Sequence, residues 1–307
     1  MSEHLVHVAV TEDCARLALH STTMAEPIRV SLTKHLEVAC LSSITRGGDA
    51  HTLKLLRECR DELAHRREGD FVEQKLAFLL GWRGHNAADR HFKPIYRLVE
   101  PEAYENAGAE DPDVFRPSDV RIYHDVVIFR EVYDCGRSGR FPTALLDYRL
   151  ESHPGFQAVN VEQVSDLLSG LWLRSLLEVQ SFVRTEENLD VWIKRTLDRY
   201  LPFGVDIVRY ADAYFRPDND KMRRFIVDNN FYDRTDPLIV LARSIQHGKP
   251  DRTIDLDKAV EAAATQSQYA QTIRKGYLYL VATSEYLEGR IDEEELGRLF
   301  DLDKPHV

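Results

Sequence analysis

The chain has 307 residues, of which 43% are hydrophobic and 30% charged, and its formal net charge is −11. This balance is typical of a globular protein in water, and the negative charge argues against a general binder of nucleic acids or anionic membranes. No segment approaches the ~18 uninterrupted apolar residues of a membrane span, and the N-terminus lacks the pattern of a secretion signal. We therefore expect a cytoplasmic protein without a transmembrane segment.

Apolar residues recur with the 3.6-residue period of an α-helix, and no segment shows convincing strand alternation. Asp49 follows a glycine pair that interrupts this pattern and is placed to cap a helix, and Pro94 is placed to stop another. We therefore predict an all-α fold. In the first half of the chain, the expected helices cover residues 4–20, 31–44 (after Pro27), 50–66, 71–92 and about 118–134.

The second half of the chain shows the same helical pattern without any chemical motif of its own. Its expected helices cover residues 161–184, 186–200, 204–215, 219–229, 236–247, 255–287 and 292–300, with capping signals at Asn160, Asp236 and Asp292. We predict a metal-binding helical domain over residues 1–155. The helices of residues 156–307 are expected to pack on it as one globular unit.

A His-x-x-x-Asp motif, His85 and Asp89, is the strongest candidate for chemistry. On a helix this spacing puts both side chains on one face, where an imidazole nitrogen and a carboxylate oxygen can bind the same ion, such as Zn²⁺. The apolar run before the motif indicates a core helix, in which ionisable groups need partners or a metal. The small residues Gly81, Gly84 and Ala88 would let other helices approach closely and bring further ligands.

Asp49 and His51 are the next candidate ligands. If the two helices around them and around the motif pack antiparallel, His85 lies opposite residue 52, and Asp49 reaches the same end of the pair. A simple helix cap for Asp49 and an exposed first-turn position for His51 are the alternatives.

Three further residues complete the expected set of ligands. His7 shares a helical stripe with apolar residues, a position that also suits an ordinary core histidine. His124 and Glu131 are seven residues apart, hence on one helix face, where they would complete a second metal site unless the face is merely polar. The sequence thus predicts as metal ligands His7, Asp49, His51, His85, Asp89, His124 and Glu131.

Basic residues flank the motif. Arg46, Arg83 and Lys93 are the candidates for binding a phosphate-bearing substrate, because guanidinium and ammonium groups pair with phosphate oxygens. The alternative is that each pairs with one of the abundant Asp and Glu side chains.

Residues 76–94, LAFLLGWRGHNAADRHFKP, resemble the core helix of the zinc-dependent phospholipase C family. The shared pattern is an apolar run that ends in glycine, then a histidine, an aspartate four residues later and a proline shortly after; here these are Gly81, His85, Asp89 and Pro94. An early helix that carries His7 and a turn that ends in Asp49 add to the resemblance, which covers roughly residues 4–97.

The resemblance implies a multi-helix orthogonal bundle of the phospholipase C type, with additional C-terminal helices. It also implies two or three zinc ions and a metal-activated water that attacks a phosphodiester. His85 and Asp89 would then be ligands, with Asp89 able to bridge two ions, and Asp49 would be a ligand and the candidate catalytic base. The expected function is metal-dependent hydrolysis of a small-molecule or lipid phosphoester.

Three alternatives stay open. A helical di-iron centre that activates oxygen also uses histidine and carboxylate ligands, and would make iron the cofactor. An HD-type phosphohydrolase would use an adjacent His-Asp pair, which occurs at His124-Asp125. The third alternative is a non-catalytic helical interaction protein, whose amphipathic residues 255–287 would pack internally or against another copy in a homo-oligomer.

Overall fold

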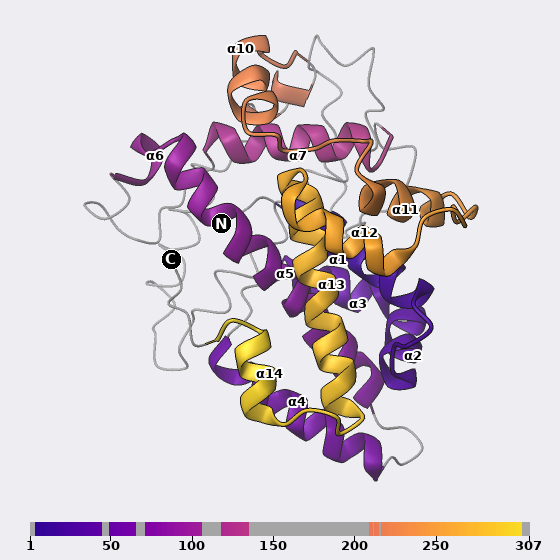
Figure 1. The fold of residues 1–307 in the computed structure, drawn as a ribbon. Coiled ribbons are helices and arrows are strands. Elements are labelled where there is room, and N and C mark those ends of the chain that lie inside the picture. The colour runs from indigo at the N-terminus through magenta and orange to yellow at the C-terminus, as the bar shows by residue number, and fades with distance from the viewer. Residues whose placement is uncertain are drawn as a thin grey trace, which may run out of the picture. The chain divides into compact units, whose positions relative to one another are not determined.

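The computed structural model describes residues 4–44, 49–65, 71–105, 118–134, 209–210, 212–214 and 216–302. These residues form helices, turns and short connections, and no strand occurs among them (Figure 1), which confirms the all-α prediction. No described helix combines the length and the apolar character that crossing a membrane requires.

The helices described in the first half of the chain correspond to the predicted ones, apart from the short α6 (Glu102–Glu105), which was not predicted, and a division at His35. They are α1 (His4–His20), α2 (Glu26–Lys34), α3 (Leu36–Ser43), α4 (Asp49–Ala64), α5 (Val72–Val99), α6 and α7 (Asp119–Glu131). The bounds of α1 are those predicted, and α4 and α7 agree to within a few residues.

Two predictions about these helices were wrong. The segment predicted as one helix after Pro27 is two helices: α2 begins at Glu26 with Pro27 in its first turn, and the non-helical backbone of His35 (φ −135°, ψ 35°) separates it from α3. Proline is tolerated in a first turn because the N–H it lacks would be unpaired there. Pro94 does not stop α5, which continues to Val99.

The second half of the described chain consists of α10 (Asn219–Met222), a π-helical turn η2 (Arg223–Val227), α11 (Pro237–Gln246), α12 (Leu256–Ala262), a 3₁₀ turn η3 (Ala263–Thr265), α13 (Gln268–Leu287) and α14 (Glu293–Leu299). The single helix predicted for residues 255–287 was wrong. The chain becomes extended at Gln266, and Ser267 caps α13 by accepting the N–H of Ala270. The helices predicted at 161–184 and 186–200, and the cap Asn160, lie outside the described residues.

The chain divides into two compact units, each built from two separate stretches of sequence. The α7 unit consists of Met1–Val6 and Pro94–Phe231, and the α13 unit consists of His7–Lys93 and Tyr232–Val307. The boundary predicted at residues 155 and 156 lies outside the described residues and stays a prediction.

In the α7 unit, α7 is a central buried helix with all residues from Val120 to Phe129 buried. The fully buried Asp125 accepts hydrogen bonds from the backbone N–H groups of Leu5 and Val6, at 3.3 and 2.9 Å. These groups belong to the first turn of α1, where N–H donors have no intrahelical partner and the helix dipole favours a negative charge. Asp125 therefore anchors the N-terminus of α1.

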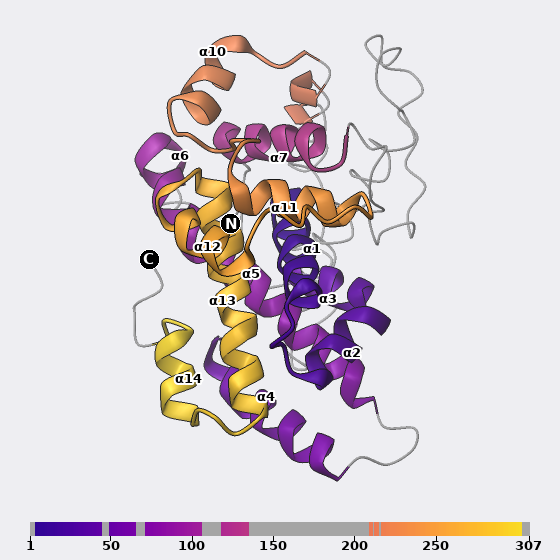
Figure 2. The same cartoon turned by 45° about the vertical axis from the view of Figure 1, so that its right-hand side comes forward.

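In the α13 unit, α13 packs closely against α1 and α5 (Figures 1 and 2). A Cβ added at Gly276 would lie 2.5 Å from Cys14 Sγ and 3.5 Å from Ala87 Cβ, so alanine there would require the Cys14 thiol to move. The Cys14 thiol donates to the carbonyl of Ile273, at 3.3 Å.

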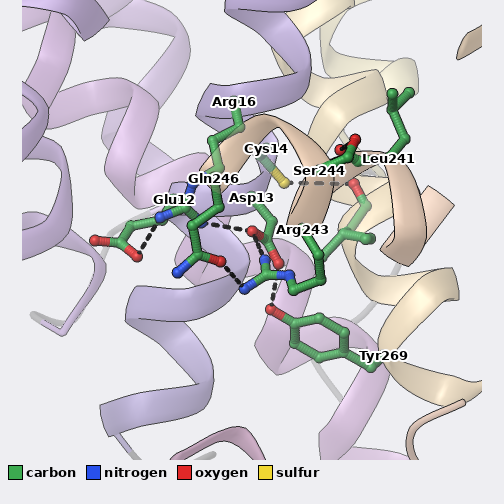
Figure 3. Close-up of polar contacts among 10 residues, drawn as sticks. Glu12, Asp13, Cys14, Arg16, Leu241, Arg243, Ser244, Gln246 and Tyr269 are labelled. Carbon is green, nitrogen blue, oxygen red and sulfur yellow. Dashed lines mark hydrogen bonds and ion pairs between the residues drawn. The ribbon is translucent and has the colours of Figure 1, made fainter. Parts of the chain in front are cut away.

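A buried ionic cluster also joins α1 to α11 and α13 (Figure 3). Asp13 is fully buried; its carboxylate accepts from Arg16, 2.6 Å away, and from Arg243. The Tyr269 hydroxyl donates to the other oxygen of the Asp13 carboxylate, at 2.8 Å. Two guanidinium groups and a phenol thus compensate the cost of burying the Asp13 charge.

Candidate metal centre

The His-x-x-x-Asp motif lies in the middle of α5, and the helix brings its two side chains together as the spacing predicts. The Nε2 atom of His85 lies 3.3 Å from Oδ2 of Asp89. Both residues are buried, with exposed fractions of 3% and 7%. An ionisable pair at this depth needs compensating charge or hydrogen bonds.

His7 from α1 joins this pair. Its ring stacks on the ring of His85, with centroids 4.4 Å apart and an interplanar angle of 16°. Its Nε2 atom lies 3.5 Å from Oδ1 of Asp89. The structure therefore brings three of the predicted ligands, His7, His85 and Asp89, to one place, with one imidazole facing each carboxylate oxygen.

Two glycines of α5 permit the close helix packing that assembles this cluster. A Cβ at Gly84 would lie 2.2 Å from the Thr11 hydroxyl on α1, one turn after His7. A Cβ at Gly81 would lie 2.0 Å from the carbonyl oxygen of Ala39 on α3. The prediction that small residues here let other helices approach is confirmed at both positions.

The α3 helix fixes the orientation of the His85 ring. Nδ1 of His85 lies 2.8 Å from the carbonyl oxygen of Ser43, the last residue of α3. A carbonyl oxygen can only accept, so Nδ1 carries a proton and donates it, and the other ring nitrogen, Nε2, faces Asp89. Metal-binding histidines commonly show this arrangement, with the second ring nitrogen held by a carbonyl. Nothing in the sequence marks Ser43, because its backbone supplies the contact.

The electrostatics of the cluster call for a cation beside Asp89. Burial by itself would raise the pKa of the Asp89 carboxyl, but the charge of His85 and hydrogen bonds from His7 and His85 hold that pKa well below its ordinary value. Asp89 is therefore ionised at neutral pH. A proton on each facing nitrogen, as these hydrogen bonds require, or a metal ion in its place keeps the nitrogen lone pair from repelling the carboxylate.

Lys93, one turn after Asp89, supplies one positive charge. Its Nζ lies 3.0 Å from Oδ2 of Asp89, and its side chain is 28% exposed. The structure thus places this predicted substrate-binding residue next to the candidate ligands, where its ammonium pairs with a carboxylate.

Arg83, the second candidate for substrate binding, is fully buried. Its guanidinium donates to the Thr52 hydroxyl at 2.6 Å and lies over the ring of Phe300, 4.9 Å from its centroid. These contacts favour a structural role for Arg83 over contact with substrate. The third candidate, Arg46, lies outside the described residues.

Asp49 and His51 lie in the first turn of α4. Their side chains are outside the described part of the structure, so their ligand roles and the proposed role of Asp49 as a base stay predictions.

His124 and Glu131 belong to α7, in the other unit from His7, His85 and Asp89. The His124 ring is fully buried and stacks on Phe231 with centroids 3.7 Å apart, and its Nε2 lies 3.2 Å from the carbonyl oxygen of Phe225. Nε2 is therefore a donor to the π-helical turn η2, which accounts for a histidine here without a metal. The second metal site of His124 and Glu131 stays a prediction.

The donor set of His7, His85 and Asp89 suits a divalent ion such as zinc or iron, since two imidazoles and one carboxylate are a common ligand combination. The distances from the two Nε2 atoms to the Asp89 oxygens, 3.3 and 3.5 Å, are longer than the donor–acceptor distances of most hydrogen bonds. They are close to the ~3.4 Å between two ligand atoms of a tetrahedral zinc site. Within the described part of the chain, however, no group of three or more His, Cys, Asp and Glu side chains could hold a metal ion as it stands.

Comparisons with protein-family models, with curated proteins and with solved structures found no match to this chain.

Proposed function

We propose that the protein is a metal-dependent phosphoester hydrolase whose divalent ion is bound by His7, His85 and Asp89. The observation that carries this proposal is the hydrogen bond from His85 Nδ1 to Ser43, since it leaves Nε2 as the nitrogen that faces an ionised, buried Asp89. The stacked His7 ring presents a second Nε2 to the same carboxylate. A cation at this position would be attracted to the Asp89 carboxylate and could be coordinated by the Nε2 atoms of both histidines.

In this proposal each residue has a separate task. The Ser43 carbonyl and the His7 ring hold the imidazole of His85 in one orientation. A divalent ion such as Zn²⁺, when bound, supplies a Lewis acid and lowers the pKa of a coordinated water to about 7. Asp49, on sequence grounds, is the proposed acceptor of the water proton.

Lys93 and the resemblance to the zinc-dependent phospholipase C family together support a phosphoester as substrate. The Lys93 ammonium lies at the Asp89 carboxylate and is the more exposed member of that pair. Positive charge beside a metal centre favours an anionic phosphoryl group.

The test is metal analysis of the purified full chain together with hydrolysis of a panel of chromogenic phosphodiesters. We expect about one or more equivalents of zinc or iron, loss of activity with a chelator, and recovery when the metal is restored. The control variant is His85→Asn, whose amide can still donate to the Ser43 carbonyl but lacks a donor atom at the Nε2 position. A correctly folded parent that binds neither metal at millimolar concentration would overturn the proposal.

A non-catalytic role is the second candidate, and the ion pair between Lys93 and Asp89 favours it. With Lys93 as the counter-ion and both histidines hydrogen-bonded, the cluster would act only to hold α1, α3 and α5 together. In that case the parent binds no metal, and the His85→Asn protein loses stability without losing any activity.

A further inference from the structure

A cavity of about 520 Å³ opens beside the C-terminal part of α13, within the α13 unit. Its volume lies in the range of about 300–1,000 Å³ that is usual for small-molecule sites. Both apolar and polar side chains line it, and none of them is a candidate metal ligand. The lining residues are Thr23, Met24, Val281, Ser284, Glu285 and Arg290.

Three of these residues share one face of α13. Val281, Ser284 and Glu285 are spaced by three and four residues, which places their side chains next to one another on a helix. The connection between α1 and α2 supplies another part of the lining. It is held against α13 by the backbone N–H of Ala25, which donates to Oγ of the buried Ser284 at 2.8 Å. A buried hydrogen bond therefore fixes the two parts of the lining relative to each other.

The turn after α13 brings Arg290 to the cavity. Gly289 has a φ of +72°, and its N–H donates to the carbonyl of Tyr286 at 3.1 Å. The N–H of Arg290 donates to the carbonyl of Glu285 at 2.8 Å. These two bonds form a Schellman motif, which turns the chain back onto the last turn of a helix. The guanidinium of Arg290 pairs with Glu288, so its charge is already balanced.

Glu285 is the one charged residue of the lining that has no counter-ion. Within the described part of the chain its carboxylate has no ion pair or hydrogen bond, whereas Glu288 and Arg290 neutralise each other. Oγ of Ser284 keeps a second lone pair beside the one that accepts from Ala25. The C-terminal end of a helix also carries partial negative charge. The polar part of the cavity therefore favours a cation with N–H donors.

Apolar side chains line the same cavity. Met24 is buried and Val281 is half-buried, and the flexible thioether of methionine adapts to ligands of different shape. A hydrocarbon chain attached to the cation would lose contact with water against these two residues.

We propose that this cavity binds a small primary amine with an apolar chain. Its ammonium donates to the Glu285 carboxylate and to Oγ of Ser284, and its chain packs on Met24 and Val281. The site shares no residue with the proposed metal centre and goes beyond the proposed function.

The test is a titration of the full chain at neutral pH and constant ionic strength, followed by ligand-observed NMR. The probes are n-butylammonium, n-butanol, which has the same chain without the charge, and butyrate, which has the opposite charge. We expect saturable binding of n-butylammonium and at least about tenfold weaker binding of the other two, because only the ammonium is attracted to Glu285.

Two variants and a control locate the binding. Glu285→Gln should weaken n-butylammonium binding at least about tenfold, because the charge is lost while the shape is kept. Val281→Phe should abolish it by filling the cavity while Glu285 stays in place. Glu261→Gln, at an exposed position on α12 outside the lining, should leave the affinity unchanged.

Three results would overturn the proposal: no saturable binding of n-butylammonium, equal binding of n-butanol or butyrate, or an unchanged affinity in Glu285→Gln. Circular dichroism verifies that the variants compared are folded. The comparison of the three probes on the parent decides the matter even if a variant does not fold.

Discussion

Nδ1 of His85 donates a 2.8 Å hydrogen bond to the carbonyl oxygen of Ser43. Ser43 is the last residue of α3, and the final carbonyl groups of a helix have no intrahelical donor. The bond therefore satisfies an acceptor that is otherwise unpaired within its helix and fixes the ring nitrogen that faces Asp89. The Ser43 carbonyl oxygen thus connects the end of α3 to the candidate ligands on α5.

Two substitutions at His85 separate these effects. Asn places an amide donor near the position of Nδ1, whereas Gln places one near Nε2. We expect metal-free His85→Gln to be about 1–3 kcal/mol less stable to urea than metal-free His85→Asn, because it leaves the buried Ser43 carbonyl without its donor. Equal stabilities of the two variants would show that the bond to Ser43 does not hold the ring.

Gly84→Ala tests the close packing of α1 on α5. The added Cβ would lie 2.2 Å from the Thr11 hydroxyl and 3.3 Å from the Thr11 Cα, so α1 has to move away from α5. We expect a loss of about 1–3 kcal/mol in urea unfolding and weaker zinc binding, because His7 moves with α1. The control is Gly297→Ala on α14, where the nearest atom, Leu53 Cδ1, is 3.5 Å away. There alanine should stabilise the protein by about 0.5–1 kcal/mol.

Arg83→Lys and Arg83→Met test whether this arginine is structural. The buried guanidinium bonds to Thr52 and lies over Phe300, a geometry that an ammonium does not reproduce. Both variants should lose about 3 kcal/mol in the free energy of unfolding. If Arg83 instead contacts substrate, Arg83→Lys would keep its stability and change mainly the KM for a phosphodiester.

His91 predicts a dependence of stability on pH. Burial, together with the charge of Lys275, lowers the pKa of His91 from 6.5 to about 4, although its hydrogen bond to Gln268 opposes this. The unfolded chain therefore takes up the proton first as pH falls, so the contribution of His91 is complete above pH 6.5 and declines down to pH 4. The free energy of unfolding that His91 contributes should fall by about 3 kcal/mol between pH 6.5 and pH 4.

The measurement is urea unfolding of the parent and of His91→Gln at several values of pH. Gln can still donate to Gln268 but does not titrate. The difference in stability between the two proteins should shift in favour of His91→Gln between pH 6.5 and 4. A difference that stays constant over this range would contradict the prediction.

Tyr269→Phe tests the cluster around Asp13. The Tyr269 hydroxyl donates to the buried Asp13 carboxylate at 2.8 Å, and a hydrogen bond to a charged group contributes about 1.5–3 kcal/mol. We expect Tyr269→Phe to lose a free energy of unfolding in this range. In an Asp13→Asn background the same substitution should cost clearly less, because the acceptor is then neutral; equal costs in the two backgrounds would show that the contact contributes little.

Within the described residues, the sequence by itself determined most of the helical segments, because the apolar period is a local property of the chain. It determined the pairing of His85 with Asp89 for the same reason, since four residues make one helical turn wherever the helix lies. Local signals were less reliable at helix ends. Pro94 lies inside α5, where Phe92 and Tyr96 on either side are fully buried, and tertiary burial outweighs the loss of one hydrogen bond.

Only the tertiary structure decided which residues from other helices meet this pair. His7 reaches Asp89 because Gly84 lets α1 approach α5, and the Ser43 carbonyl reaches His85 because Gly81 lets α3 approach. Such contacts depend on helix packing, which the apolar period does not specify. The same holds for Lys93, a basic residue compatible in sequence with binding substrate. It is paired with Asp89 because that carboxylate is buried and needs a cation close by.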